Sequence, residues 1–110
     1  PDVGCVVGLF VYNTPVIVET LTRTGKLGQV KVVGFDEADE TLAAVSAVHV
    51  QGTVVQNPYE YGYQSIKWLH EIANGTATIP ANQFIDIPAR MLRKDDVAAF
   101  QQEMKAKLGK

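Results

Sequence analysis

Four short runs of apolar and β-branched residues, each followed by a stretch with helical periodicity, constrain the fold of this chain more than any other feature. The runs comprise residues 3–11, 31–35, 53–56 and 83–88, and their length and composition are typical of strands. Strands that alternate with amphipathic helices form a parallel or mostly parallel sheet. The sequence therefore predicts an α/β fold: an open, mostly parallel sheet covered by helices, with the β-α unit repeated four times.

The first run, VGCVVGLFV, is almost continuously apolar. This pattern is typical of a central strand that helices cover on both faces. The run contains Cys5, the single cysteine, which cannot close an internal disulfide and lacks the CxxC spacing of a zinc site. We therefore predict a buried thiol at Cys5.

Capping residues mark where the four helices are expected to begin. The clearest signal combines Asn57 as N-cap, Pro58 at the first helical position and Glu60 three residues after the cap. The predicted N-caps of the other three helices are Thr14, Asp39, and Asp95 or Asp96. The first helix is expected to run to about Arg23, with Gly25 ending it, and Gly75 is expected to end the third.

Apolar side chains recur at helical spacing and indicate which face of each predicted helix packs inward. The stripe of the second helix consists of Leu42, Val45 and Val48, and that of the last helix of Val97, Phe100, Met104 and Leu108. The stripe of the helix from Asn57 consists of Tyr59, Tyr63, Ile66, Leu69 or His70, and Ala73. We expect all three stripes to face apolar neighbours.

The composition limits the classes of partner. A chain of 110 residues, 46% of them hydrophobic, is suited to one folded domain. Its net charge of -2 provides no basic face, so neither nucleic acid nor an anionic membrane is an expected partner. Because the chain begins at Pro1 and not at methionine, we expect a processed or excised piece, whose missing signal sequence is no evidence for a cytoplasmic location.

A polar residue follows each of the first three predicted strands: Asn13, Asp36 and Gln56. Open parallel sheets hold their ligands beyond the carboxyl ends of the strands. A carboxylate accepts hydroxyl groups, and each side-chain amide both donates and accepts, so the set suits a neutral polyhydroxylated ligand. Each residue also has a structural alternative: a turn for Asn13, a helix N-terminus for Asp36, and backbone groups for Gln56.

Three segments carry a resemblance to a known family. VVGLFVYNTP, VKVVGFDE and TVVQNPYEYGYQSIKWL resemble, in order and spacing, the C-terminal part of type I periplasmic solute-binding proteins of sugar ABC transporters, the ribose-binding-like group. The resemblance covers nearly the whole chain and implies that Asn13, Asp36 and Gln56 hydrogen-bond a sugar in a cleft between two lobes. One departure is Thr14-Pro15, since the family often has an acid after this asparagine.

The resemblance implies a non-enzymatic periplasmic or extracytoplasmic protein without cofactor or metal. It would capture a monosaccharide or polyol by closing two lobes, and deliver it to the permease of an ABC transporter. Family members are two to three times longer, so the fold is expected to be incomplete without an N-terminal lobe.

The resemblance also implies a domain plan. Residues 1–56 and 89–110 would form the C-terminal sugar-binding lobe, and residues 57–88 would cross to the N-terminal lobe. The hinges would be Gln56 with Asn57 and Ile87 with Pro88. The helix from Asn57 would then expose its apolar stripe. Either this helix repacks on its own sheet, two chains self-associate by exchanging segments, or the chain is one piece of a longer one, and these three alternatives stay open.

Two other functions are alternatives for a chain with this pattern. The effector-binding domain of a LacI-type transcription regulator shares this fold and a similar VGFD stretch, but QNPYEYGY and the added helix near Asp95 favour the transporter protein. A phospho-acceptor domain would need a further acidic pair at another strand tip to hold Mg²⁺ and a lysine near a later strand, and the sequence shows no such set. Cys5, His49 and His70 are scattered outside any catalytic motif, so no catalytic residue is predicted.

Overall fold

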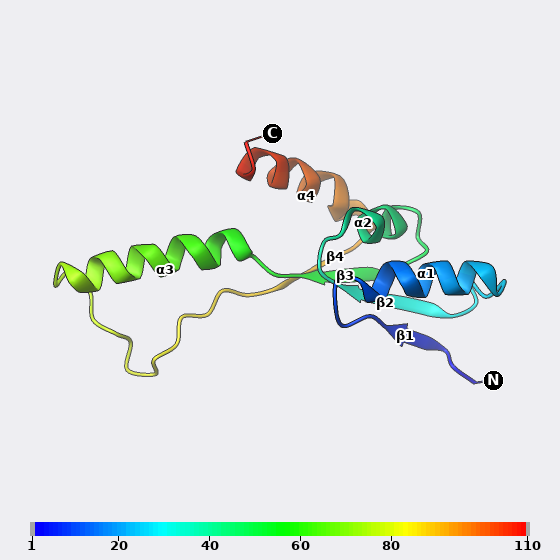
Figure 1. Ribbon diagram of the computed structural model, residues 1–110, viewed down its shortest axis with the longest axis horizontal. Coiled ribbons are helices and arrows are strands. Elements are labelled where there is room, and N and C mark those ends of the chain that lie inside the picture. The colour runs from blue at the N-terminus through cyan, green and yellow to red at the C-terminus, as the bar shows by residue number, and fades with distance from the viewer. Residues whose placement is uncertain (1, 110) are drawn as a thin grey trace. The chain divides into compact units, whose positions relative to one another are not determined.

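The computed structural model describes residues 2–109, in which strands and helices alternate along the chain (Figure 1). The elements are β1 Cys5–Val7, α1 Asn13–Arg23, β2 Lys31–Phe35, α2 Asp39–Ser46, β3 Gly52–Val55, α3 Pro58–Ala73, β4 Arg90–Leu92 and α4 Lys94–Lys107. They form two compact units. The first unit contains the chain up to Val55 and again from Arg90, and the second unit is Gln56–Ala89.

The sheet of the first unit has the strand order β1-β2-β3-β4. Strands β1, β2 and β3 are parallel, with Val6 opposite Val32 and Gly34 opposite Thr53, whereas β4 pairs with β3 in the antiparallel direction. The predicted α/β fold with a mostly parallel open sheet is therefore confirmed.

Helices α1, α2 and α4 pack against one face of this sheet (Figure 1). Their buried side chains form one core with the strands: Leu21, Val32, Leu42, Ala44, Val45, Val50, Val55, Leu92, Val97 and Phe100. Along β2, Val32 and Gly34 are buried while Val33 and Phe35 are half-buried, as expected when a single face is covered. The prediction that helices cover both faces is therefore wrong for the first unit.

Strand β1 is an edge strand and not the predicted central one. It covers three residues of the expected 3–11, because after Gly8 donates its N–H to Val33 O (2.9 Å) the chain turns away toward α1. Within residues 2–109 its sole partner is β2. The prediction of a buried Cys5 is wrong for the same reason, since the thiol of an edge strand is exposed.

Three predicted N-caps are wrong, because each residue lies inside its helix. Helix α1 begins at Asn13, which leaves Thr14 fully buried in the first turn. Asp39 is the first residue of α2 after Ala38. Asp95 and Asp96 lie in the first turn of α4, and Asp96 accepts a hydrogen bond from the Arg93 N–H (2.8 Å). Acids in the first turn of a helix interact favourably with its dipole without occupying the cap.

The predicted stripes of α2 and α4 pack into the core except at their last residues. Leu42 and Val45 in α2, and Val97 and Phe100 in α4, are buried, and Met104 packs against them. Val48 and Leu108 are exposed because each follows the end of its helix, and Val48 adopts a left-handed backbone (φ 62°). The predicted end of α1 is confirmed at Arg23, with Gly25 at φ 67°.

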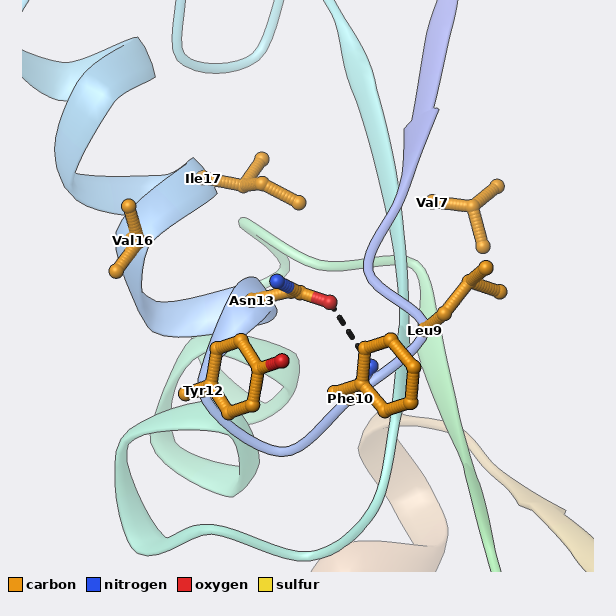
Figure 2. A pocket seen from close by; sticks show the side chains of 7 residues that line it. All are labelled: Val7, Leu9, Phe10, Tyr12, Asn13, Val16 and Ile17. Atoms are coloured by element: carbon orange, nitrogen blue, oxygen red, sulfur yellow. Dashed lines mark hydrogen bonds between the residues drawn. The ribbon is translucent and has the colours of Figure 1, made fainter.

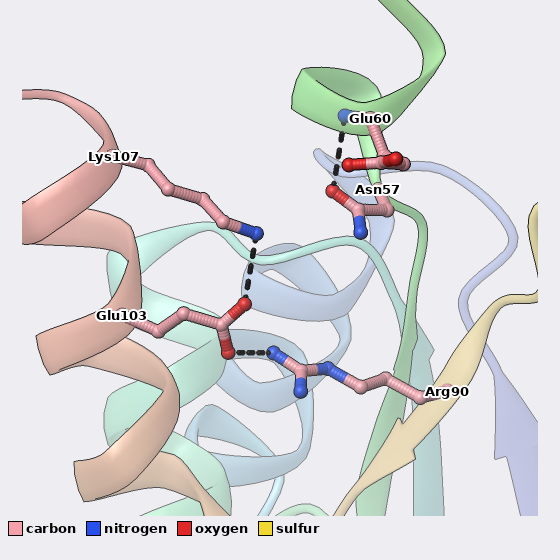
Figure 3. A network of polar contacts seen from close by, with 5 residues as sticks. All are labelled: Asn57, Glu60, Arg90, Glu103 and Lys107. Carbon is pink, nitrogen blue, oxygen red and sulfur yellow. Dashed lines mark hydrogen bonds and ion pairs between the residues drawn. The ribbon is translucent and has the colours of Figure 1, made fainter. Parts of the chain in front are cut away.

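An ion-pair network joins β4 to α4 (Figure 3). Glu103 accepts hydrogen bonds from Lys107 Nζ (2.8 Å) and Arg90 Nη2 (2.6 Å), and these lower the pKa of Glu103, the Lys107 contact more than the Arg90 contact. Arg90 also lies over the ring of Phe100 at 4.9 Å. The first unit thus fixes its last helix by polar as well as apolar contacts.

The second unit begins with the best-specified helix of the sequence. The predicted cap is confirmed, since Asn57 Oδ1 accepts a hydrogen bond from the Glu60 N–H (3.3 Å) and Pro58 is the first helical residue (Figure 3). Helix α3 contains no buried residue, and its stripe residues Tyr59 and Ile66 are among the exposed apolar side chains.

The predicted fourth strand at residues 83–88 is wrong. These residues have no regular secondary structure, and the Phe84 N–H donates a hydrogen bond to Asn82 Oδ1 (3.2 Å). Pro88 has no N–H to give to a sheet, and the strand forms instead just beyond it, as β4. Leu92 of β4 is buried in the core, whereas residues 83–86 are all exposed.

Candidate functional site

The predicted site residues follow the ends of adjacent strands. Asn13 lies beyond β1 at the start of α1, Asp36 directly follows β2, and Gln56 directly follows β3. Because β1, β2 and β3 are parallel, their carboxyl ends share one edge of the sheet. The structure places Asn13 and Asp36 in the first unit, whereas Gln56 is the first residue of the second.

Asp36 adopts a backbone conformation that is unusual for a residue with a side chain. Its φ of 69° lies in the left-handed region. Two contacts from β3 hold it there: the Asp36 N–H donates to Val54 O (2.8 Å), and Thr53 Oγ1 donates to Asp36 O (2.7 Å). Strain of this kind concentrates at functional sites, where the surrounding structure maintains it.

The tip of β2 lies very close to the start of α1. A Cβ on Gly34 would come within 2.7 Å of Thr14 Oγ1, and a Cβ on Gly8 would meet the same atom at 2.7 Å. The buried Thr14 therefore packs directly on Gly34 of β2 and on Gly8, which follows β1. This close packing fixes the position of the adjacent Asn13 against the sheet.

Asn13 closes a tight turn with Phe10 (Figure 2). Its Oδ1 accepts a hydrogen bond from the Phe10 N–H (3.0 Å), and its own N–H donates to Phe10 O (2.9 Å). The turn role that the sequence left open is thus present. It uses only the amide oxygen, and Asn13 Nδ2 donates no hydrogen bond within residues 2–109. The amide therefore keeps two donors for a ligand.

Glu37 lies next to Asp36 and is half-buried. Burial, and after it the negative charge of Asp36, raise the pKa of Glu37, against the lowering effect of a backbone hydrogen bond. Its environment shows that this end of the sheet is partly shielded from water.

Two aromatic residues at this edge were missed by the sequence-based prediction. Phe10 and Tyr12 are stacked, with ring centroids 5.7 Å apart and planes inclined by 11°. They border a hollow of about 360 Å³ lined by Val7, Leu9, Phe10, Tyr12, Asn13, Val16 and Ile17 (Figure 2). The signal in the sequence is FVYN, which places two aromatic residues immediately before the predicted ligand-binding asparagine.

The remaining reactive side chains do not form a site. Cys5 and His49 are exposed, and His70 of α3 lies beside Asn74, the residue that follows this helix. Among residues 2–109, no group of three acidic, histidine or cysteine residues is arranged to hold a metal ion. No helix in the same residues is long and apolar enough to cross a membrane.

Helix α3 carries a second hollow, of about 550 Å³. Its lining residues are Tyr59, Gly62, Tyr63, Ile66, Lys67 and His70. The apolar members belong to the stripe that the sequence predicted to face a neighbour. In the described part of the second unit, none of them is buried.

The sequence matches the model of a protein family described as a periplasmic binding protein domain, over residues 1–77. A comparison with functionally curated proteins gave no match.

The structure is similar to those of several solute-binding proteins. A glucose-galactose binding protein from Geobacillus stearothermophilus, GanP, is 27% identical with a TM-score of 0.78, over 87% of this chain and 33% of that one. A carbohydrate transporter solute-binding protein from Agrobacterium radiobacter, in complex with D-arabinose, is 25% identical (TM-score 0.75; 94% and 34%). AraP, an arabinose-binding protein from G. stearothermophilus, shares the fold at 22% identity (TM-score 0.76; 91% and 36%). This chain thus spans about a third of their length.

Proposed function

Since this chain belongs to the family of periplasmic binding protein domains, we propose that it is part of the sugar-binding component of an ABC transporter. Support comes from the similar structures, which include a glucose-galactose binding protein and a carbohydrate transporter protein in complex with D-arabinose. The matched family and structures are binding proteins, and the chain is not an enzyme. It captures a monosaccharide or polyol without changing it chemically.

The observation that carries the proposal is the conformation of Asp36. Its strained backbone is held by Val54 and Thr53 directly after β2, at the sheet edge where open parallel sheets bind ligands. The ionised carboxylate accepts two sugar hydroxyls in strong, charge-assisted hydrogen bonds. Asn13 donates to the ligand through Nδ2, and Gln56 both donates and accepts.

Binding is proposed to close two lobes around the sugar. The first unit belongs to the C-terminal lobe, the second unit crosses to the other lobe, and the hinges are Gln56 with Asn57 and Ile87 with Pro88. The division of the chain after Val55 and before Arg90 supports this plan. A ligand that contacts both lobes stabilises the closed state by its differential affinity for that state.

The closed protein then presents its ligand to the permease of the transporter. This places the protein in the periplasm or elsewhere outside the cytoplasm. Support for this location comes from the family to which the chain belongs.

Calorimetric titration of the natural chain that carries these residues tests the proposal. The panel is D-glucose, D-galactose, D-arabinose and D-fucose, and at least one of these sugars is expected to bind. Asp36→Asn should weaken that sugar at least about tenfold, since hydrogen bonds to charged groups contribute about 1.5–3 kcal/mol. Asp39→Asn, on the exposed first turn of α2, is the matched control and should leave affinity unchanged. Absence of binding, or equal affinity for Asp36→Asn and wild type, overturns the proposal.

A further inference from the structure

Thr53 places a hydroxyl group on a face of β3 that is otherwise apolar. Its side chain is fully buried, and Val55, which points to the same face two residues later, belongs to the hydrophobic core. Valine has almost the shape of threonine, and burial of a hydroxyl costs free energy unless the group is hydrogen-bonded. The hydroxyl of Thr53 therefore requires a partner that offsets this cost.

The partner of this hydroxyl is the backbone of Asp36. Thr53 Oγ1 donates a hydrogen bond to Asp36 O (2.7 Å), and Asp36 in turn donates its N–H to Val54 O (2.8 Å). Strand β3 thus binds both backbone polar groups of Asp36, one through a side chain and one through its main chain.

Gly34 leaves the space in which the Thr53 hydroxyl lies. It stands opposite Thr53 in the parallel pair of β2 and β3. A Cβ on Gly34 would come within 3.2 Å of Thr53 Oγ1 and within 2.7 Å of Thr14 Oγ1. The absence of a side chain at this position therefore lets the hydroxyl reach Asp36.

The contact from Thr53 decides where the Asp36 carboxylate points. The left-handed backbone of Asp36 (φ 69°) is unfavourable for a residue with a side chain and persists only where neighbouring groups hold it. Rotation about φ toward the extended region changes the direction of the Cα–Cβ bond. Loss of the Thr53 hydroxyl would therefore release the carboxylate from its present direction.

We propose that Thr53 is a positioning residue of the ligand site, which holds Asp36 in its left-handed conformation so that the carboxylate is aimed before the ligand arrives. Thr53 acts through Asp36 and does not itself contact the ligand. The inference rests on the proposed function, because it explains how that site is kept ready for a sugar.

Calorimetric titration of the natural chain tests this role. The probe is whichever of D-glucose, D-galactose, D-arabinose and D-fucose binds wild type most tightly. Thr53→Val removes the hydroxyl and keeps the shape, so it should weaken binding at least about threefold, within the range expected for one hydrogen bond. Thr53→Ser restores the hydroxyl and should bind within about twofold of wild type. Thr53→Ala gives the same test as Thr53→Val if the valine variant does not fold.

Thr41 supplies a matched control. It is also a fully buried threonine, but within residues 2–109 its Oγ1 makes no hydrogen bond. Thr41→Val should therefore leave the affinity for the same sugar within about twofold of wild type.

A double-mutant cycle distinguishes positioning from a general loss of structure. If Thr53 acts through the carboxylate, Thr53→Val should change affinity by less than about twofold when Asp36→Asn is already present. A purely structural role would weaken the sugar equally in both backgrounds.

Hydrogen exchange of the unliganded protein gives a readout that does not depend on sugar affinity. The Asp36 amide should exchange at least about threefold faster in Thr53→Val than in wild type. The reference is the Gln51 amide, which donates to Val32 O (2.8 Å) and should be unchanged.

The outcomes separate the two proposals. If a sugar binds and Asp36→Asn weakens it, but Thr53→Val and Thr53→Ala bind as wild type does, the positioning role is wrong and the proposed function stands. The same conclusion follows if Thr53→Ser or Thr41→Val is as weak as Thr53→Val, if the two backgrounds respond equally, or if exchange at Asp36 is unchanged. If no sugar of the panel binds wild type, both proposals fail.

Discussion

The two units of this molecule differ in whether their apolar residues are buried. In the first unit, strands and three helices enclose a common core that includes Leu42 and Val55. In the second unit, α3 has an equally clear apolar stripe, yet none of its residues is buried. An N-cap and helical periodicity are therefore enough to specify a helix such as α3. Burial of its apolar stripe requires, in addition, other elements that pack against it.

Two leucines provide the largest expected contrast between the units. In the chain of residues 1–110, Leu42→Ala should lower the free energy of unfolding by about 2–5 kcal/mol, because Leu42 is 1% exposed. Leu69→Ala on α3 should change it by less than about 0.5 kcal/mol, because Leu69 is 65% exposed. Urea denaturation measures both. Similar losses for the two variants would show that the stripe of α3 is buried, and would abolish the distinction.

Two glycines should respond to the same substitution with opposite signs. Gly34→Ala places a Cβ within 2.7 Å of Thr14 Oγ1, so it should destabilise the first unit by about 1–3 kcal/mol. Gly62→Ala meets no atom within 4 Å inside α3, so it should increase helicity and stabilise α3 by about 0.5–1 kcal/mol. Thermal unfolding followed by circular dichroism distinguishes them. A stabilising Gly34→Ala would contradict the close packing of α1 on β2.

Loss of a helix cap should affect the second unit alone. Asn57→Ala removes the acceptor of the Glu60 N–H and should cost α3 about 1 kcal/mol. Helicity should fall while the denaturation midpoint of the first unit, followed by hydrogen exchange of the β2 and β3 backbone amides, stays unchanged. A matching drop in that midpoint would mean that the two units unfold together.

Two carboxylates of the first unit should give the smallest effects, with opposite dependence on pH. Glu37 has a raised pKa, so its stabilising contribution is present below the unfolded pKa of about 4.3 and is lost as pH rises through its folded pKa. Glu37→Gln should therefore raise the melting temperature slightly at pH 7 and leave it unchanged at pH 3.

Glu103 has a lowered pKa, so its contribution is present above the unfolded pKa and is lost as pH falls through its folded pKa. Glu103→Gln should lower stability at pH 7 by less than about 1 kcal/mol, because the ion pairs are exposed. The difference should vanish at pH 2. Shifts of equal sign for the two variants at pH 7 would show that these environments are misassigned.

The sequence predicted elements whose signals are local. The strand at Lys31–Phe35, the Asn57 cap and the glycines after α1 and α3 were all identified, because each depends on a few neighbouring residues. The predicted strand at 83–88 and the central position of β1 were wrong. Both depend on strand neighbours that lie far away in a sequence, and apolar composition does not specify them.

The candidate site was likewise predictable only where its signals are local in the sequence. The position of Asn13 and Asp36 beyond strand ends follows from the order of the elements. The strained backbone of Asp36 was not predictable, since it depends on hydrogen bonds from β3. The stacking of Phe10 on Tyr12 depends on the turn between β1 and α1, which periodicity does not describe.

A crystal structure of the natural chain, grown with the sugar that binds most tightly in the titrations, tests the central claim most directly. The account predicts sugar hydroxyls within about 2.5–3.0 Å of the Asp36 carboxylate and close to Asn13 Nδ2. A sugar bound elsewhere, with no contact to Asp36 or Asn13, would contradict it.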